Sequence, residues 1–347
     1  MKTFLNFAFL NLFFCSIIYG TIWHQSLKDP KMLRFRTDQV IQLVQRAKND
    51  LGQKFDQYPY KFIVSDDLSI KITGFEGISS IDFLDKNHIK DNLFLVFCHT
   101  DDDYFHALKK IKDNVGKFYA LPFFGPKTRY VWTDKYALNA VDEKFAFVTK
   151  ISHQNIDVHE IICQCLQVTK HLPGDYVEIG VYVGGSALTA LHYMKFAGMQ
   201  RKSYFLDTFD GMTYEEAHQS PDLIWDNTHK LWGVEQTMNY VSDLLKTTGQ
   251  HYKLVQSNIC ADLLPKEIEK IVVCNVDVDL YEPTLEALNK VAPLVVKGGI
   301  IICEDPTSTP TLVGALLAME EFLLTEMGSK FLKILVGGQY LLIKMAE

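Results

Sequence analysis

The sequence predicts an α/β protein whose C-terminal part contains a sheet of five parallel strands extended by an antiparallel hairpin. Two observations lead to this prediction. After Gly174, apolar strand-like runs alternate with helical patterns, and parallel strands need such helical crossovers. The last two strand-like runs are separated only by Gly337, Gly338 and Gln339, a connection so short that it requires antiparallel pairing.

Length and composition restrict the class of protein. The chain has 347 residues, enough for about two domains. Its 48% hydrophobic and 22% charged residues are typical of a globular core and not of a disordered chain. The formal net charge of −7 does not favour nucleic acid as a partner. Seven cysteines without a CxxC pair favour reduced thiols over disulfides or a zinc site.

Residues 1–24 form a hydrophobic N-terminal segment, with no charged residue from 3 to 23. This length fits a membrane anchor or a signal sequence, and burial against the protein body is the third interpretation. One lysine precedes the segment and four basic residues follow it, namely Lys28, Lys31, Arg34 and Arg36. An anchor would therefore leave the body of the protein in the cytoplasm. The secretory pathway is the alternative localisation.

The sequence pattern of residues 32–145 predicts a smaller α/β unit. No residue in it indicates a catalytic or binding role. Helices are expected at 38–51 and after Asp103, and strands at 61–64, 93–99 and 117–122. The three consecutive aspartates at 101–103 could bind a metal. We interpret them as helix caps, because carboxylates complement the free N–H groups at a helix start.

The C-terminal domain is expected to occupy residues 153–347 and to begin with a helix at 153–170, which Pro173 and Gly174 terminate. The five parallel strands are expected at 176–181, 203–207, 252–256, 271–278 and 299–303, and the hairpin strands at 332–336 and 340–344. This strand order is that of the Rossmann-like class I methyltransferases.

A short turn between the first strand and its helix contains Gly180, Gly184, Gly185 and Ser186. Glycines allow backbone N–H groups to approach a ligand at a helix start, although tight packing explains them equally well, and the spacing is not GxGxxG. We expect Glu178 to accept a hydrogen bond from a ligand ammonium, and Asp207 to bind ribose hydroxyls. S-adenosylmethionine has an ammonium group and a ribose but no phosphate, so these two carboxylates and the glycine turn fit it better than they fit NAD.

Carboxylates also follow the fourth and fifth strands, as Asp277 and as Glu304 with Asp305. Neighbouring parallel strands end at one crevice, so these side chains can converge. A hard dication such as Mg²⁺ explains such a cluster best, and helix capping or pairing with a lysine are the alternatives. Asp279 is expected to point to the opposite face, because side chains alternate along a strand.

Taken together, these motifs resemble the macrocin O-methyltransferase (TylF-type) family of class I S-adenosylmethionine-dependent methyltransferases. The resemblance rests on GDYVEIGV at 174–181, GGS at 184–186, DTFDG at 207–211, DVDLYEPT at 277–284, the glycines at 298–299 and ED at 304–305. It covers the chain from about residue 153 to the C-terminus and leaves the first 145 or so residues unmatched.

The resemblance implies an enzyme that uses S-adenosylmethionine and Mg²⁺ to methylate a hydroxyl group of a sugar or natural-product-like small molecule. It places the metal ligands at Asp277, Glu304 and Asp305. The chain departs from the family in two places. The family usually has two aspartates where this chain has Glu304 and Asp305, and it tends to have an arginine where this chain has Val183.

The catalytic hypothesis is that a bound metal lowers the pKa of the acceptor hydroxyl and aligns it with the methyl donor. Asp277 is the candidate base, with His229 as the second choice, since a lone histidine is more often a surface or lid residue. Residues 212–231 are too long and polar for a plain connection and predict a substrate lid.

Two other functions remain open. A DxD-type glycosyltransferase or phosphatase is suggested by Asp277 and Asp279 after an apolar strand, although such phosphatases carry their acid pair on the first strand. A catalytically inactive methyltransferase-fold scaffold is suggested by Glu304 and the apolar N-terminus. Membrane attachment through residues 3–23 and homo-oligomerisation are open as well.

Overall fold

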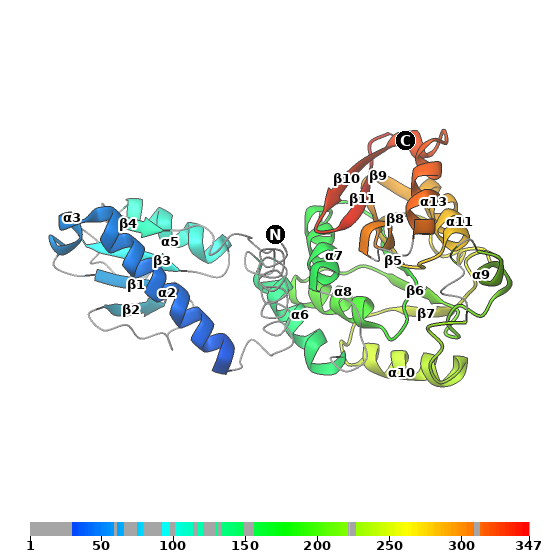
Figure 1. The fold of residues 1–347 in the computed structure, drawn as a ribbon, viewed down its shortest axis with the longest axis horizontal. Helices are drawn as coiled ribbons and strands as arrows, with labels where there is room; N and C mark the ends of the chain where they lie inside the picture. Colours follow the sequence, from blue (N-terminus) through cyan, green and yellow to red (C-terminus); the bar gives the residue numbers. More distant parts are fainter. Residues whose placement is uncertain are drawn as a thin grey trace, which may run out of the picture. The chain divides into compact units, whose positions relative to one another are not determined.

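The computed structural model describes residues 30–58, 61–65, 75–79, 92–97, 101–113, 117–120, 130, 134–148, 156–220, 222, 227–308 and 313–346. The chain divides into two compact units, Met1–Leu138 and Asn139–Glu347 (Figure 1). The hydrophobic segment predicted at 1–24 lies outside the described residues. Within the ranges above, no helix combines the length and the apolar character that a membrane crossing requires.

The N-terminal unit contains a parallel sheet with the strand order β2-β1-β3-β4. Its elements are α2 (Pro30–Leu51), α3 (Gln53–Asp56), β1 (Lys61–Ser65), β2 (Glu76–Ser79), β3 (Leu93–Phe97), α5 (Asp101–Asp113) and β4 (Lys117–Ala120). Helix α2 begins eight residues before its predicted start at 38, and Pro30 suits a first helical position because proline lacks the N–H that a helix start leaves unpaired. Strand β2, with the sequence EGIS, lacks the apolar alternation that predicts a strand.

Two apolar clusters cover the two faces of this sheet. Helix α2 contributes Val44 to one cluster, which includes Leu95 of β3, and α5 contributes Ile111 to the other, which includes Val96 of β3. Neighbouring residues of β3 thus face opposite helices, as the alternation of side chains along a strand requires.

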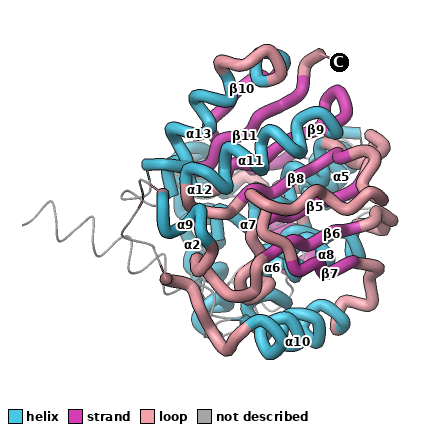
Figure 2. Tube along the Cα trace, turned by 90° about the vertical axis from the view of Figure 1, so that its right-hand side faces the viewer, coloured by secondary structure: helices cyan, strands magenta, loops and turns pink. Residues whose placement is uncertain are grey.

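The C-terminal unit is built on a sheet with the order β10-β11-β9-β8-β5-β6-β7, which Figure 2 shows from top to bottom. Its strands are β5 (Asp175–Ile179), β6 (Ser203–Asp207), β7 (Lys253–Gln256), β8 (Ile271–Val276), β9 (Val295–Cys303), β10 (Phe331–Val336) and β11 (Gln339–Lys344). Strands β5 to β9 pair in parallel, and β11 is antiparallel to both of its neighbours. The predicted fold class, five parallel strands and an antiparallel hairpin, is confirmed.

Helices connect these strands and cover both faces of the sheet. They are α7 (Ile156–Val168), α8 (Gly185–Phe196), α9 (Glu215–Gln219), α10 (Val234–Lys246), α11 (Tyr281–Val291), α12 (Asp305–Ser308) and α13 (Val313–Leu323), with 3-10 turns η3 (Ala292–Leu294) and η4 (Gly328–Lys330). Helix α6 (Lys135–Val148) precedes them and contains the boundary between the two units. Ile179 of β5 lies in the core cluster that includes Leu288 of α11 and Phe322 of α13. Glu178, its neighbour in β5, faces α8.

The hairpin turn consists of two residues, Gly337 and Gly338. Val336 pairs with Gln339 across it, so Gln339 belongs to β11 and not to the connection. Both glycines have positive φ, 57° and 90°, which a two-residue turn matched to the strand twist requires. The turn therefore fixes the register of β11 against β9.

Candidate functional site

A cavity of about 500 Å³ lies at the carboxyl ends of the parallel strands. Its walls come from the turns that follow β5 to β9, the place where open α/β sheets bind ligands. The candidate site residues that line it are Gly180, Gly185, Asp207, His229, Asp277, Glu304 and Asp305.

Strained backbone is concentrated around this cavity. Among the described residues, five other than glycine have positive φ, and four of these line the cavity: Tyr182, Phe209, His229 and Asp279. Such conformations cost energy and persist where the surroundings impose them, often at functional sites.

The three predicted metal ligands converge. Asp277, Glu304 and Asp305 each offer a carboxylate oxygen, and these oxygens lie within 4.8 Å of one another. The parallel register pairs Val276 of β8 with Cys303 of β9, so the residues that follow the two strands emerge side by side. An all-carboxylate donor set fits a hard dication such as Mg²⁺.

Asp279 lies in the same cavity, and its prediction for the opposite face is wrong. Residues two apart in a strand share a face, so alternation would itself have placed Asp279 on the side of Asp277, and the period of two does not support the opposite face. The strand β8 also ends at Val276, and Asp279 has a φ of 64°. Its N–H donates to Asp305 Oδ2 at 2.7 Å. Burial, followed by the charge of Glu304, raises the pKa of Asp279 to about 7.

Asp305 is the most enclosed carboxylate of this group, with 2% of its surface exposed. Its Oδ2 accepts hydrogen bonds from the N–H groups of Val278 and Asp279. Burial raises the pKa of Asp305 well above its usual range, and the charges of Asp279 and Asp277 raise it further. Crowded buried carboxylates of this kind take up protons or a cation, because either one relieves the repulsion.

Gly180 connects the glycine turn to the acidic cluster. It has a φ of 89°, and a Cβ at this position would lie 1.7 Å from the carbonyl oxygen of Asp277. Next to it, the N–H of Asp277 donates to the carbonyl oxygen of Ile179 at 2.9 Å. Only glycine therefore fits at 180, and the close packing that the sequence left as an alternative does explain this glycine.

Asp207 organises the turn from the neighbouring strand. Its Oδ2 accepts hydrogen bonds from the N–H groups of Val181 at 2.6 Å and Tyr182 at 2.9 Å, and its Oδ1 accepts one from Phe209 at 2.6 Å. Asp207 lines the cavity, as expected, but the contacts that the structure provides for its carboxylate are backbone donors.

Glu178 is placed differently from the expectation. It is fully buried beneath α8 and accepts hydrogen bonds from Tyr176 Oη and Ser186 Oγ, both at 2.7 Å. Burial raises its pKa to about 7, and the two hydrogen bonds act in the opposite direction. The cavity lining does not include Glu178, Gly184 or Ser186. For Glu178 the reason is the alternation of side chains along β5, which turns it toward α8.

His229 belongs to the segment predicted as a lid and does line the cavity. Its ring lies edge-on to Tyr182, with 5.5 Å between ring centroids, and its Nδ1 is 2.9 Å from Thr228 Oγ1. The ends of the segment are joined, because the N–H of Met212 donates to the Thr228 carbonyl and the N–H of Asn227 to the Met212 carbonyl, each at 3.0 Å. Residues 221 and 223–226 lie outside the described part of the chain.

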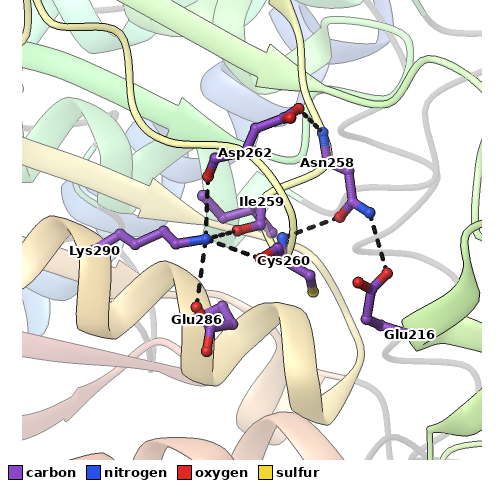
Figure 3. Close-up of polar contacts among 7 residues, drawn as sticks. All are labelled: Glu216, Asn258, Ile259, Cys260, Asp262, Glu286 and Lys290. Carbon is purple, nitrogen blue, oxygen red and sulfur yellow. Dashed lines mark hydrogen bonds and ion pairs between the residues drawn. The ribbon is translucent and has the colours of Figure 1, made fainter.

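Sequence reasoning missed the loop after β7 (Figure 3). Asn258 lines the cavity, and its Nδ2 donates to Glu216 Oε2 of α9 at 3.1 Å. From α11, Lys290 Nζ donates to the carbonyl oxygens of Ile259, Cys260 and Asp262, and forms an ion pair with Glu286. These contacts join the loop to α9 and α11, and nothing in the local sequence distinguishes Lys290 from a surface lysine.

Thr237 of α10 is a second residue that the sequence did not indicate. It is 3% exposed and lines the cavity, and its Oγ1 has no hydrogen-bond partner among the described residues. A buried hydroxyl without a partner is costly, so this one fits a cavity that receives a polar ligand.

The strand order and the cavity at its carboxyl edge define a class I methyltransferase fold. Residues 138–323 match the family model described as macrocin-O-methyltransferase (TylF). The match includes more than half of the chain, and the chain belongs to this family.

Two curated relatives come from Streptomyces. The 8-demethyl-8-(2,3-dimethoxy-alpha-L-rhamnosyl)-tetracenomycin-C 4'-O-methyltransferase of Streptomyces olivaceus is 27% identical over 142 residues, which are 39% of this chain and 53% of the relative. Demethyldecarbamoylnovobiocin O-methyltransferase of Streptomyces niveus is 25% identical over 166 residues, 44% of this chain and 60% of the relative. The chain thus spans little more than half the length of these relatives.

Two solved structures resemble the chain. The O-methyltransferase NovP is 20% identical with a TM-score of 0.46, and the alignment covers 56% of this chain and 81% of NovP. The calicheamicin methyltransferase CalS11 is 18% identical with a TM-score of 0.45, and the alignment covers 61% of this chain and 92% of CalS11.

Proposed function

We propose that this protein is an S-adenosylmethionine-dependent O-methyltransferase, assisted by Mg²⁺, that acts on a hydroxyl group of a sugar or natural-product-like small molecule. The observation that carries the proposal is the convergence of Asp277, Glu304 and Asp305 in the cavity that the glycine turn also lines. The family adds support, since both curated relatives are named as O-methyltransferases and one name specifies a rhamnosyl compound.

Each part of the cavity has a proposed role. Gly180, Gly185 and Asp207 contact the methyl donor, and Glu178, Gly184 and Ser186 hold the turn in shape from behind. Thr237 offers its hydroxyl to the donor from α10. Asp277, Glu304 and Asp305 would hold Mg²⁺. When bound, S-adenosylmethionine would supply the methyl group, and Mg²⁺ would supply positive charge that lowers the pKa of the acceptor hydroxyl.

The acceptor hydroxyl must lose a proton to a group in the cavity. Asp277 is the proposed base, with His229 as the alternative, and both line the cavity. The aromatic pair of His229 and Tyr182 is better suited to contact the acceptor, because its rings form part of the cavity wall.

Calorimetric titration of the purified chain with S-adenosylmethionine tests the donor. Methyl transfer to a panel of glycosylated small molecules, with Mg²⁺ or with a chelator, tests the reaction. Asp277→Asn is expected to lower turnover at least about a hundredfold, and Asp243→Asn, an exposed carboxylate of α10, serves as the matched control.

Three results would contradict the proposal in different ways. A chain that binds no S-adenosylmethionine would favour the DxD-type glycosyltransferase or phosphatase. Binding without turnover on any acceptor would favour the inactive scaffold. If neither the chelator nor Asp277→Asn changed the turnover, the reaction would not depend on Mg²⁺.

A cytoplasmic site, with or without attachment to a membrane through residues 3–23, stays a prediction. Protease protection of the full chain in intact cells tests it, and cleavage near residue 150 by external protease would contradict it.

A further inference from the structure

The C-terminal hairpin brings an amide to the acidic cluster. Tyr340 of β11 pairs with Cys303 of β9 in an antiparallel register, so Gln339 lies opposite Glu304. Gln339 Nε2 donates a hydrogen bond to Glu304 Oε1 at 3.3 Å. Both residues are buried, Gln339 with 2% and Glu304 with 7% of its surface exposed.

The orientation of the Gln339 amide follows from charge. Its Nε2 is a donor and Glu304 is an acceptor when ionised, whereas the reversed amide would place two oxygens against each other. Gln339 Oε1 has no hydrogen-bond partner among the described residues, so the contact with Glu304 is the one that its side chain makes. An amide here holds the carboxylate without adding a charge to the cluster.

Glu304 needs such a contact more than its neighbours do. Its side chain has one methylene and one rotatable bond more than those of Asp277 and Asp305, so its carboxylate has more positions to sample. Groups that orient metal ligands from outside contribute to metal affinity by restricting those positions. The two-residue turn at 337–338 sets the register that delivers Gln339, and a slip by one residue would turn its side chain to the other face.

We propose that Gln339 is a positioning residue that holds the Glu304 carboxylate toward Asp277 and Asp305 for binding a divalent cation. This inference rests on the proposed function. Gln339 does not line the cavity and lies beyond residues 138–323, which match the family model. The group that orients Glu304 therefore comes from a part of the chain outside that match.

The test is a double-mutant cycle on Mn²⁺ binding, measured with the full chain by the electron paramagnetic resonance signal of free Mn²⁺. Gln339→Leu is expected to weaken Mn²⁺ binding about tenfold. In a Glu304→Asp background the same change is expected to alter binding less than about twofold, because the shorter side chain no longer reaches the amide. Gln339→Met, close to glutamine in length, is the second variant in case leucine impairs folding.

Tyr340→Phe is the matched control, since it changes the next residue of β11, whose ring contacts Lys333. In Tyr340→Phe, Mn²⁺ affinity, thermal unfolding and S-adenosylmethionine affinity are all expected to stay unchanged. An equal loss of Mn²⁺ affinity in both backgrounds, or no loss in either, would overturn the inference. A wild-type chain that binds no Mn²⁺ would overturn the proposed metal site together with it, whereas wild-type binding that Gln339→Leu leaves intact would overturn the inference alone.

Discussion

Asp222 and Gly314 are joined by a hydrogen bond from the Gly314 N–H to Asp222 Oδ1 at 3.0 Å. Asp222 Oδ2 also accepts from the N–H of Tyr281 at 3.1 Å. One buried carboxylate from the segment after β6 thus caps the first turns of α11 and α13. Helix α11 follows the loop that carries Asp277, and α13 follows α12, which begins at Asp305, so Asp222 links the segment after β6 to the acidic cluster.

Gly314→Ala is expected to destabilise the protein by about 1 to 3 kcal/mol, because a Cβ at this position would lie 1.7 Å from Asp222 Oδ2. Urea unfolding measures the loss. In an Asp222→Ala background the clash is absent, so the same substitution is expected to cost much less. An equal cost in both backgrounds would show that the contact with Asp222 is not the cause.

Asp222→Ala by itself leaves two helix-terminal N–H groups without their carboxylate, and we expect it to lower the free energy of unfolding by about 1 to 2 kcal/mol. The free energy of unfolding of Asp222→Asn should lie between those of the wild type and Asp222→Ala, because an amide oxygen can accept from one of the two donors. Asp243→Ala, on the exposed side of α10, is the control and should change stability little. Equal stabilities for Asp222→Ala and the control would contradict the capping role.

Glu178 is expected to make stability depend on pH. Its pKa rises from an unfolded value near 4.5 to about 7 in the folded protein, mainly through burial. The folded state therefore binds the proton more tightly, so the contribution is full below about pH 4.5 and is lost as the pH rises toward 7. Between these limits the wild type should lose roughly 3 kcal/mol more than Glu178→Gln.

Urea unfolding at a series of pH values compares the two proteins, with Glu235→Gln as the control for an exposed glutamate. The groups that face Glu178 are Tyr176 Oη and Ser186 Oγ, with Asp207 acting through its charge. Parallel curves for wild type and Glu178→Gln would mean that Glu178 does not titrate in this range.

The convergence of the acidic residues could be predicted because it depends on strand pairing alone. The apolar runs that end at Val276 and Cys303 indicate neighbouring buried strands, and parallel pairing then brings Asp277 and Glu304 together. The two-glycine turn likewise predicts the hairpin. In both cases a local pattern determines which chain segments pair.

Positions that depend on where a strand ends could not be predicted. Asp279 lies beyond the end of β8 at Val276, and its left-handed backbone has no sequence signal in the absence of glycine, so the strand period cannot place its side chain. Asp222 and Lys290 contact backbone groups at least 28 residues away in the sequence. The spacing of apolar and polar residues does not indicate such long-range pairs.

Lys290→Met is expected to weaken S-adenosylmethionine binding about three- to tenfold and to lower stability by about 1 to 3 kcal/mol. The ammonium group satisfies carbonyl oxygens of the loop after β7 (Figure 3). Three residues of that loop, Ser257, Asn258 and Ile259, line the cavity. Without it, the part-buried carbonyls of Ile259 and Cys260 lose their donor, and the loop is less well ordered before the ligand binds. Lys246→Met, an exposed lysine of α10, is the control. Calorimetric titration that gives the same affinity for wild type and Lys290→Met would show that the loop is held by other contacts.

His229→Gln is expected to raise the KM for the acceptor by about tenfold while kcat changes less than about threefold, because His229 stands in the cavity wall against Tyr182 and Asp277 is the proposed base. Tyr182→Leu should act in the same direction, since it removes the other ring of the pair. Steady-state kinetics with the best acceptor separates the two parameters. A fall in kcat of a hundredfold or more in His229→Gln, with KM unchanged, would assign the proton transfer to His229, because removal of a general base acts on the chemical step and not on acceptor binding.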